Sequence, residues 1–259
     1  MADGVTIERR DGGARLALTL SRPRQRNAIT VAMYAALADA IAGAATDPAI
    51  RVITFQGEGD DFTAGNDLYD FLNDMPQPGS DVDVPVWRLL RALADNDVPI
   101  VAAVHGNCVG IGTTMLLHCD LVMAELGTKF VMPFVDLGLV PEAASSLLLP
   151  RLAGRRAAAR HLLLGEPFGA EQALAMGIAS HVVPGGGLTA ALDRTVAALL
   201  AKPVEALRQT QRLLRTAERA EIRDRMELEN SHFAERLASD EVKQVIAAFF
   251  AARAKAPAA

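Results

Sequence analysis

The sequence Val98-Pro-Ile-Val-Ala-Ala-Val-His-Gly-Asn-Cys-Val-Gly-Ile-Gly-Thr-Thr-Met-Leu-Leu-His-Cys-Asp120 joins a predicted strand, a turn and a predicted helix. The apolar run from Ile100 to Val104 predicts a buried strand. The turn holds glycines at positions 106, 110 and 112, and helix-forming residues follow from Thr113 to His118. Glycines at such a crossing let a ligand or another backbone approach closely. A helix start also presents unpaired N–H groups that favour negative charge. The stretch therefore predicts a site for a phosphate or a developing oxyanion.

The glycine pattern argues against a phosphate-binding loop. A nucleotide-binding loop of the P-loop type would continue with a Lys-Ser/Thr pair, and a dinucleotide fingerprint needs a third glycine after Gly110-x-Gly112. Neither feature is present in this sequence. The oxyanion interpretation is therefore favoured.

Length and composition restrict the class of protein. A chain of 259 residues can bury a full core, as one large α/β domain or as a core with a small appendage. A formal net charge of −5 argues against a dedicated nucleic-acid binder. No apolar run approaches the ~18 residues of a membrane span, and no signal-peptide pattern opens the chain. The two cysteines, Cys108 and Cys119, are predicted core thiols. We expect a cytoplasmic protein without a membrane or nucleic-acid partner.

The remaining chain predicts an α/β front and an all-helical back. The segment from Met75 to Pro85 is predicted to be a surface loop, with a mobile flap as the alternative. Hydrophobic periodicity predicts a hairpin (6–10 and 15–20), further strands (52–56, 121–124, 129–132, 179–183) and helices (30–45, 86–94, 143–152, 154–164, 170–176, 188–201, 204–217, 221–238, 240–254). We expect a core over 1–195 and a helical domain over 196–259.

Three blocks of sequence together resemble the crotonase family, the enoyl-CoA hydratase/isomerase superfamily. They are Arg22-Pro23 to Asn27-Ala28-Ile29, Phe62-Thr63-Ala64-Gly65-Asn66-Asp67-Leu68, and His105-Gly106 to Asp120. They occur in the order and at the spacing of the family, and the resemblance covers nearly the whole chain. It implies an α/β spiral of strand-strand-helix turns with a C-terminal helical domain that closes the site. It also implies a homotrimer or a hexamer.

The resemblance implies that two backbone N–H groups hold the thioester oxygen of an acyl-coenzyme A substrate. The matching positions are Asn66 and Ile111, both at glycine-flanked turns. The loss of one such donor typically costs ~2.7–4 kcal/mol of transition-state stabilisation. Coenzyme A is part of the substrate, so no cofactor is expected. Substrate-binding roles are implied for Arg22, Arg26, Ala28, Ala64, Gly65, Asp67, Leu68, Gly110 and Phe134.

The positions of acid and base groups distinguish hydratases from isomerases within the family. Hydratases resemble one another in two glutamates that hold a water, and here those positions match Thr114 and Phe134. Neither side chain can exchange a proton as a carboxylate does. The stretch that ends in Pro141-Glu142-Ala143 resembles the 3,2-enoyl-CoA isomerases instead, in which one glutamate at the position of Glu142 works alone. Ala143 departs from the glycine that is usual after this glutamate.

Alternatives remain for the function and for individual residues. A hydratase that uses Glu142 with a differently placed water is one, and a catalytically weak acyl-CoA-binding relative is another. Glu142 could instead interact with a helix dipole, which contributes ~0.3–1 kcal/mol. Asp67 is expected to order its loop rather than to act as an acid. His105 and His118 are expected to be structural, because no Cys/His/Asp spacing indicates a metal site.

Overall fold

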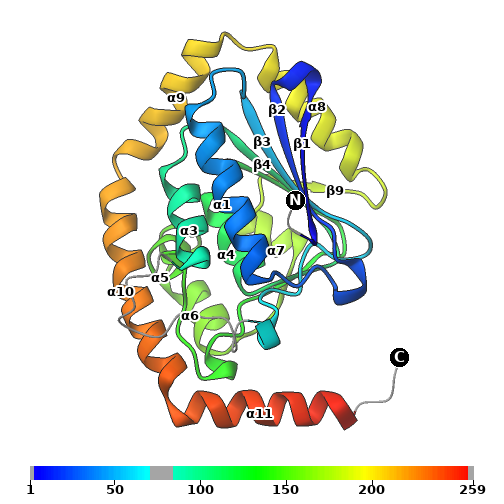
Figure 1. Cartoon of the computed structure of the whole chain (residues 1–259). Helices are drawn as coiled ribbons and strands as arrows, with labels where there is room; N and C mark the ends of the chain where they lie inside the picture. Colours follow the sequence, from blue (N-terminus) through cyan, green and yellow to red (C-terminus); the bar gives the residue numbers. More distant parts are fainter. Residues whose placement is uncertain (1–2, 71–83, 256–259) are drawn as a thin grey trace.

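A computed structural model describes residues 3–70 and 84–255, and these form two sheets followed by a run of C-terminal helices (Figure 1). The predicted α/β fold class is confirmed. Residues 75–83 of the predicted surface loop lie outside the described residues. None of the helices within the described ranges has the length and apolarity that crossing a bilayer would need.

The larger sheet has six strands in the order β1-β2-β3-β4-β6-β9. The predicted hairpin is confirmed, because β1 (Val5–Arg10) pairs antiparallel with β2 (Arg15–Leu20) around the short helix η1 (Asp11–Gly13). All other pairs in this sheet are parallel. The strands that complete it are β3 (Val52–Gly57), β4 (Ile100–Val104), β6 (Leu121–Glu125) and β9 (His181–Val183). Parallel neighbours need long crossover connections, and helices supply them.

Strand β4 is buried on both faces, which explains its uninterrupted apolar sequence. Ile100, Ala102 and Val104 belong to the main hydrophobic core, whereas Val101 and Ala103 belong to a smaller second core. On the main-core side the sheet is covered by α1 (Val31–Thr46) and α3 (Pro85–Asp95), which pack against each other. The second core is closed by α8 (Leu188–Leu200). Figure 1 shows α1 and α8 on opposite sides of the strands.

The stretch after β4 contains a strand that the sequence did not predict. β5 (Asn107–Val109) pairs in parallel with β7 (Lys129–Val131), which pairs antiparallel with β8 (Phe168–Gly169) to form a second sheet. The prediction of a plain turn before the helix is therefore wrong at 107–109. A strand of two or three residues shows almost no alternation, and its partners across the sheet define it.

Helices near the second sheet also begin away from their predicted positions. The helix expected from Thr113 begins at Ile111, as α4 (Ile111–Thr114), and continues as the 3₁₀ helix η3 (Met115–His118). The helix expected from Ala143 begins at Ser145 instead. The other elements here are η2 (Pro23–Gln25), η4 (Val135–Leu137), α5 (Ser145–Ala153), α6 (Arg155–Leu163) and α7 (Ala170–Ala175).

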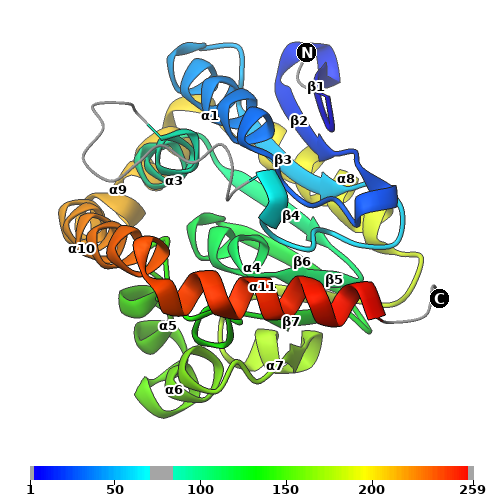
Figure 2. The ribbon, with the colours of Figure 1, turned by 60° about the horizontal axis from the view of Figure 1, so that its bottom comes forward.

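Three C-terminal helices form an arm along one side and one end of the molecule. They are α9 (Val204–Thr216), α10 (Arg219–Ala238) and α11 (Asp240–Lys255). Figure 1 shows α9 and α10 descending beside α3 and α5, and Figure 2 shows α11 passing over the region of α4 and β5. Arg215 of α9 fastens the arm, because its guanidinium donates to the carbonyls of His118 (2.6 Å) and Leu93 (2.9 Å) and to the Asp120 carboxylate.

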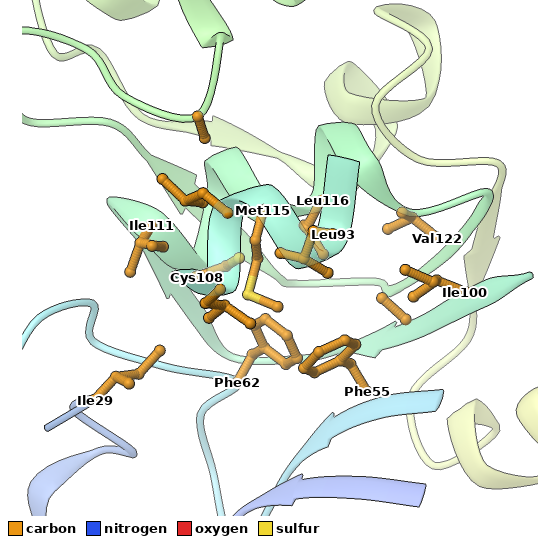
Figure 3. Packing of buried hydrophobic residues seen from close by; sticks show 14 of the residues in the cluster. Ile29, Phe55, Phe62, Leu93, Ile100, Cys108, Ile111, Met115, Leu116 and Val122 are labelled. Carbon is orange, nitrogen blue, oxygen red and sulfur yellow. The ribbon is translucent and has the colours of Figure 1, made fainter. Parts of the chain in front are cut away.

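The main core extends to the edge of the turn between β5 and α4. Figure 3 shows Phe55 and Phe62 from the β3 side packed below Cys108 and Met115, with Ile111 at the edge of this group. Ile111 has an exposed fraction of 1 %. The start of α4 is therefore fixed by apolar packing.

Candidate active site

Two turns that are distant in the sequence lie against each other. Thr63, in the turn after β3, donates its amide hydrogen to the carbonyl of Asn107 and accepts one from the amide of Val109, both at 3.0 Å. Its hydroxyl also donates to the carbonyl of Asn27 at 2.7 Å. Thr63 thus joins three segments that bear the sequence blocks of the family resemblance.

Two glycines allow this close approach. Gly65 has a φ of +87°, and a Cβ atom there would lie 2.9 Å from the carbonyl oxygen of Val109. A Cβ atom on Gly112 would collide with the methyl group of Thr63. A larger residue at either position would push the two turns apart.

Each turn presents one backbone N–H group without a backbone acceptor among the described residues. The amide of Asn66 is one of them, because Ile29 pairs with the neighbouring Gly65 carbonyl and Asp67 amide and leaves the Asn66 amide directed away. The amide of Ile111 is the other, since it opens α4 and has no partner within its helix. Both residues line one cavity. The two residues that carry these N–H groups therefore border the same space.

A buried carboxyl group belongs to Glu142, in the segment just before α5. Glu142 is 1 % exposed, and its Oε1 has no hydrogen-bond partner among the described residues. Burial raises the pKa of this carboxyl to about 8, and the nearby Glu229 carboxylate contributes in the same direction. A hydrogen bond with the Thr114 hydroxyl opposes the increase. A carboxyl with a pKa this close to neutrality is suited to accept and return a proton.

Tyr34 of α1 connects Glu142 with the cavity wall. Its buried hydroxyl donates a hydrogen bond to the side-chain Oδ1 of Asn66. Burial raises the pKa of Tyr34, and the charge of Glu142 raises it further. Glu142 does not itself line the cavity, but it lies within electrostatic range of a side chain that is bonded to Asn66.

The backbone after Glu142 is strained and is held from two sides. Ala143 and Ala144 have φ values of 61° and 53°, in the left-handed region that alanine rarely adopts. The Nε2 of His118 donates to the carbonyl of Ala143 at 2.8 Å. From α10, the Glu229 carboxylate accepts from the amides of Ala144 (2.6 Å) and Ser146 (2.9 Å). The left-handed residues explain why α5 begins later than predicted.

The cavity has a volume of about 770 Å³ and a mainly apolar wall. Side chains from the C-terminal arm complete this wall, including Phe233 of α10 and Ile246 of α11. A volume of this size suits a sizeable organic ligand. Nine residues predicted for the site line the cavity: Ala28, Ala64, Gly65, Asn66, Asp67, Leu68, Gly110, Ile111 and Phe134.

The two predicted arginines lie outside the cavity wall. Arg22 donates to the carbonyl of Ala28 (2.7 Å) and to the Asp67 carboxylate (3.0 Å), so it orders the loop beside the site. Arg26 lies 3.9 Å from the Asp61 carboxylate. Arg24 is the arginine that lines the cavity. The substrate-binding roles of Arg22 and Arg26 stay predictions.

Sequence reasoning missed Tyr34, Glu229 and Arg24. Tyr34 lies within an apolar helix and Glu229 within a charged one, so local pattern does not distinguish either. Arg24 lies between Arg22 and Arg26 in the sequence, and only the folded shape of the loop shows that Arg24 is the one that reaches the cavity wall. Within the described residues no three His, Cys, Asp or Glu side chains are grouped closely enough to hold a metal ion.

Comparison with known proteins gives the same family as the sequence blocks. The family profile described as enoyl-CoA hydratase/isomerase matches residues 12–256. A 1,2-epoxyphenylacetyl-CoA isomerase from Escherichia coli is 34 % identical over 244 residues, which are 92 % of this chain and 92 % of that protein. A 2,3-dehydroadipyl-CoA hydratase from the same organism is 35 % identical over 170 residues, 65 % of this chain and 66 % of the relative.

A solved structure extends the similarity to three dimensions. The crystal structure of an enoyl-CoA hydratase/isomerase from Pseudoalteromonas atlantica superposes with a TM-score of 0.90 at 38 % identity. The similarity covers 99 % of this chain and 100 % of that one. With the paired turns, the buried carboxyl and the cavity already described, the chain belongs to the enoyl-CoA hydratase/isomerase family.

Proposed function

We propose that this protein is an enoyl-CoA isomerase, which moves the double bond of a 3-enoyl-CoA to the 2-position. The observation that carries the proposal is that, of the three positions that match the acid and base groups of the family, Glu142 alone holds a carboxyl group. The carboxylates of Asp67 and Asp136 also line the cavity but do not match those positions. The two positions that match the hydratase glutamates hold Thr114 and Phe134, which cannot exchange a proton as a carboxylate does. Thr114 lies beside Glu142, because its hydroxyl forms a hydrogen bond with that carboxyl group.

The reaction is a proton transfer within one substrate. Ionised Glu142 takes a proton from C2 of the 3-enoyl thioester, and the electron pair shifts onto the thioester oxygen to form a dienolate. The amides of Asn66 and Ile111 donate hydrogen bonds to that oxygen, where the negative charge has developed. Protonated Glu142 then returns the proton at C4, and the double bond becomes conjugated with the thioester. One carboxyl serves both steps, so no second acid or base is needed.

Water addition to a 2-enoyl-CoA is the second candidate activity. It is supported by the similarity to the 2,3-dehydroadipyl-CoA hydratase, and it would use Glu142 with a water held by another group. The two activities are distinguished by offering the purified protein a 3-enoyl-CoA and, separately, a 2-enoyl-CoA. We expect rapid conjugation of the first and slow hydration of the second. Fast hydration with slow isomerisation would reverse this order.

The substitution Glu142→Gln tests the role of the carboxyl. It keeps the shape of the side chain and removes its basicity, so isomerisation should fall by at least ~10²-fold. Affinity for the acyl-CoA, measured by calorimetry, should change little. The exposed Glu227 of α10 provides the control, because Glu227→Gln makes the same substitution at a residue that does not line the cavity. Near-normal turnover by Glu142→Gln would exclude Glu142 from the mechanism.

Self-association into a trimer or hexamer is part of the proposal. Large apolar side chains face outward on the C-terminal arm: Leu213 is 78 % exposed, Leu214 69 % and Leu228 51 %. Exposed apolar groups of this kind are typical of protein–protein contacts. Sedimentation velocity should give a species of three or six chains, and a monomer at micromolar concentration would contradict this expectation.

A further inference from the structure

Glu229 lies 83 and 85 residues from its two backbone partners in the sequence but contacts the Glu142 segment directly. Its side chain is 5 % exposed and spans two amides: Oε2 lies 2.6 Å from the Ala144 nitrogen and Oε1 2.9 Å from the Ser146 nitrogen. These amides open α5, where N–H groups lack helical partners. A carboxylate that accepts two such bonds holds this backbone in one arrangement.

We propose that Glu229 is a positioning residue, which fixes the Glu142 segment through the amides of Ala144 and Ser146 and thereby places the Glu142 carboxyl for proton transfer. This inference rests on the proposed function of Glu142 as the base. It assigns to the C-terminal arm a direct part in arranging the reacting group.

Backbone geometry explains why this segment needs external support. The left-handed conformation is unfavourable for alanine, so Ala143 and Ala144 would relax without contacts that hold them. The His118 imidazole holds the Ala143 carbonyl from the core side, and Glu229 holds the following amides from the arm. Removal of either support should let Glu142 move, and a displacement of 1 Å at a reacting group can cost ~10²-fold in rate.

Charge adds a second effect of Glu229 on Glu142. The Glu229 carboxylate raises the pKa of Glu142. Burial raises the pKa of Glu229 itself, and its hydrogen bonds with Ser146 and Ala144, together with the charge of Arg225, oppose that increase. Arg225 also donates to the Ser146 hydroxyl at 3.2 Å. Two further ionisable side chains near the segment, His118 and Tyr34, are neutral near pH 7, and the charge of Arg215 also acts on His118. Burial keeps the pKa of the His118 imidazole down at about 4, and burial raises the pKa of Tyr34. Glu229 is thus the group whose removal should lower the pKa of Glu142.

The test compares Glu229→Gln, Glu229→Asp and the control Glu227→Gln across a range of pH. Glutamine offers one acceptor oxygen in place of two and no charge, so kcat should fall by about tenfold or more with KM nearly unchanged. The inflection of kcat/KM against pH should also move to lower pH. Aspartate keeps the charge but shortens the reach, so kcat should fall without that movement. Glu227→Gln should behave as the parent does.

A purely structural Glu229 would give a different result. Activity would then fall only in proportion to the folded fraction, measured by circular dichroism, and the pH inflection would stay in place. Either that result or unchanged kcat in Glu229→Gln overturns the proposal.

A second measurement is independent of any enzymatic activity. Glu142→Gln should stabilise the fold at pH 8, and the gain should be smaller when Glu229→Gln is already present, because the repulsion between the two carboxylates is gone. An equal gain in both backgrounds contradicts the proposed coupling. The two substitutions can be coupled in stability even if the protein does not isomerise a 3-enoyl-CoA. In that case the proposed function fails, and the interaction of Glu229 with the Glu142 segment remains supported.

Discussion

Glu142 shows a conflict between stability and chemistry at the scale of one residue. A buried carboxyl with an unpaired oxygen costs free energy, and a folded protein normally pairs such a group. Here the same burial raises the pKa to about 8, where the group can both accept and release a proton near neutral pH. The cost is consistent with a function that requires the unpaired oxygen.

The pH dependence of stability should reveal this cost. The pKa of Glu142 is about 8 when folded against 4.5 ordinarily, so the folded chain retains a proton that the unfolded chain releases. Stability should therefore decline as pH rises from about 4.5 towards 8, and Glu142→Gln should remove that part of the decline. We expect the variant to be more stable by about 1–3 kcal/mol at pH 8 and nearly unchanged at pH 4. Urea unfolding of the parent protein and of Glu142→Gln at the two pH values measures this difference. Equal stability of the two proteins at pH 8 would contradict the assigned burial of Glu142.

The pH dependence of activity in the parent protein should follow the ionisation of Glu142. A base must be ionised to take a proton, so kcat/KM for isomerisation should rise with pH through an inflection near pH 8. Initial rates from pH 5.5 to 9.5 provide the measurement. A profile that is flat between pH 6 and 9 would show that Glu142 does not act as the base in the free enzyme.

The site residues differ in how far the sequence could predict them. Asn66 and Ile111 were assigned through the family resemblance, and the glycine-flanked turns in which they lie agree with that assignment. Glu142 was indicated by the motif around it. Tyr34 and Glu229 carry no local signal, because their roles come from contacts with residues 32 and 85 positions away.

At the scale of elements, the proposed oxyanion site depends on how closely two turns approach. β3 and β4 are parallel neighbours, and the turns that follow them are joined by Thr63. The turns can approach this closely because Gly65 and Gly112 have no Cβ atom, which would otherwise collide with the facing turn. The separation of the Asn66 and Ile111 amides thus depends on glycine at positions 65 and 112.

Gly65→Ala tests this dependence. Its φ of +87° strains any other residue, and the added methyl group would meet the Val109 carbonyl at 2.9 Å. The turns should separate, and kcat should fall by about tenfold to 10²-fold. Gly43→Ala is the control: it lies in α1 with no atom near the added methyl group, and it should stabilise the helix by about 1 kcal/mol without affecting kcat. Unchanged kcat in Gly65→Ala would show that the turns tolerate the extra volume.

Long elements were predicted well from the sequence, and short ones were not. β4 and the four helices after residue 187 carry enough periodic residues to indicate their type. β5 and β8 have three and two residues, so they exist only through their pairing with β7. The late start of α5 reflects two left-handed alanines, and alanine is a residue that favours helix.

At the scale of the whole molecule, the C-terminal arm is joined to the core by buried polar contacts. Arg215 donates to three backbone carbonyls and one carboxylate, and its side chain is 13 % exposed. These contacts connect α9 to η3, which carries His118. The arm also contributes apolar residues to the cavity wall. The site is therefore assembled from both ends of the chain.

Arg215→Met should weaken this attachment. Methionine retains much of the apolar stem but removes the donor to three carbonyls, and it leaves the half-buried Asp120 carboxylate with Gln211 and the Ile100 amide as its remaining donors. Unfolding should therefore become easier by about 2–3 kcal/mol. Arg212→Met is the matched control on the same helix, because its guanidinium is 59 % exposed and pairs only at the surface with Asp97. That change should cost about 0–1 kcal/mol. Similar losses for the two variants in urea titrations would contradict the assigned role of Arg215.

The contact between Glu229 and the backbone before α5 has a consequence for biosynthesis. A nascent polypeptide that has emerged from the ribosome as far as α8 already contains both glycine-flanked turns and Glu142. It lacks the carboxylate that holds the Glu142 segment, because α10 has not yet emerged. The order of translation thus delays catalytic competence until the last helices have docked.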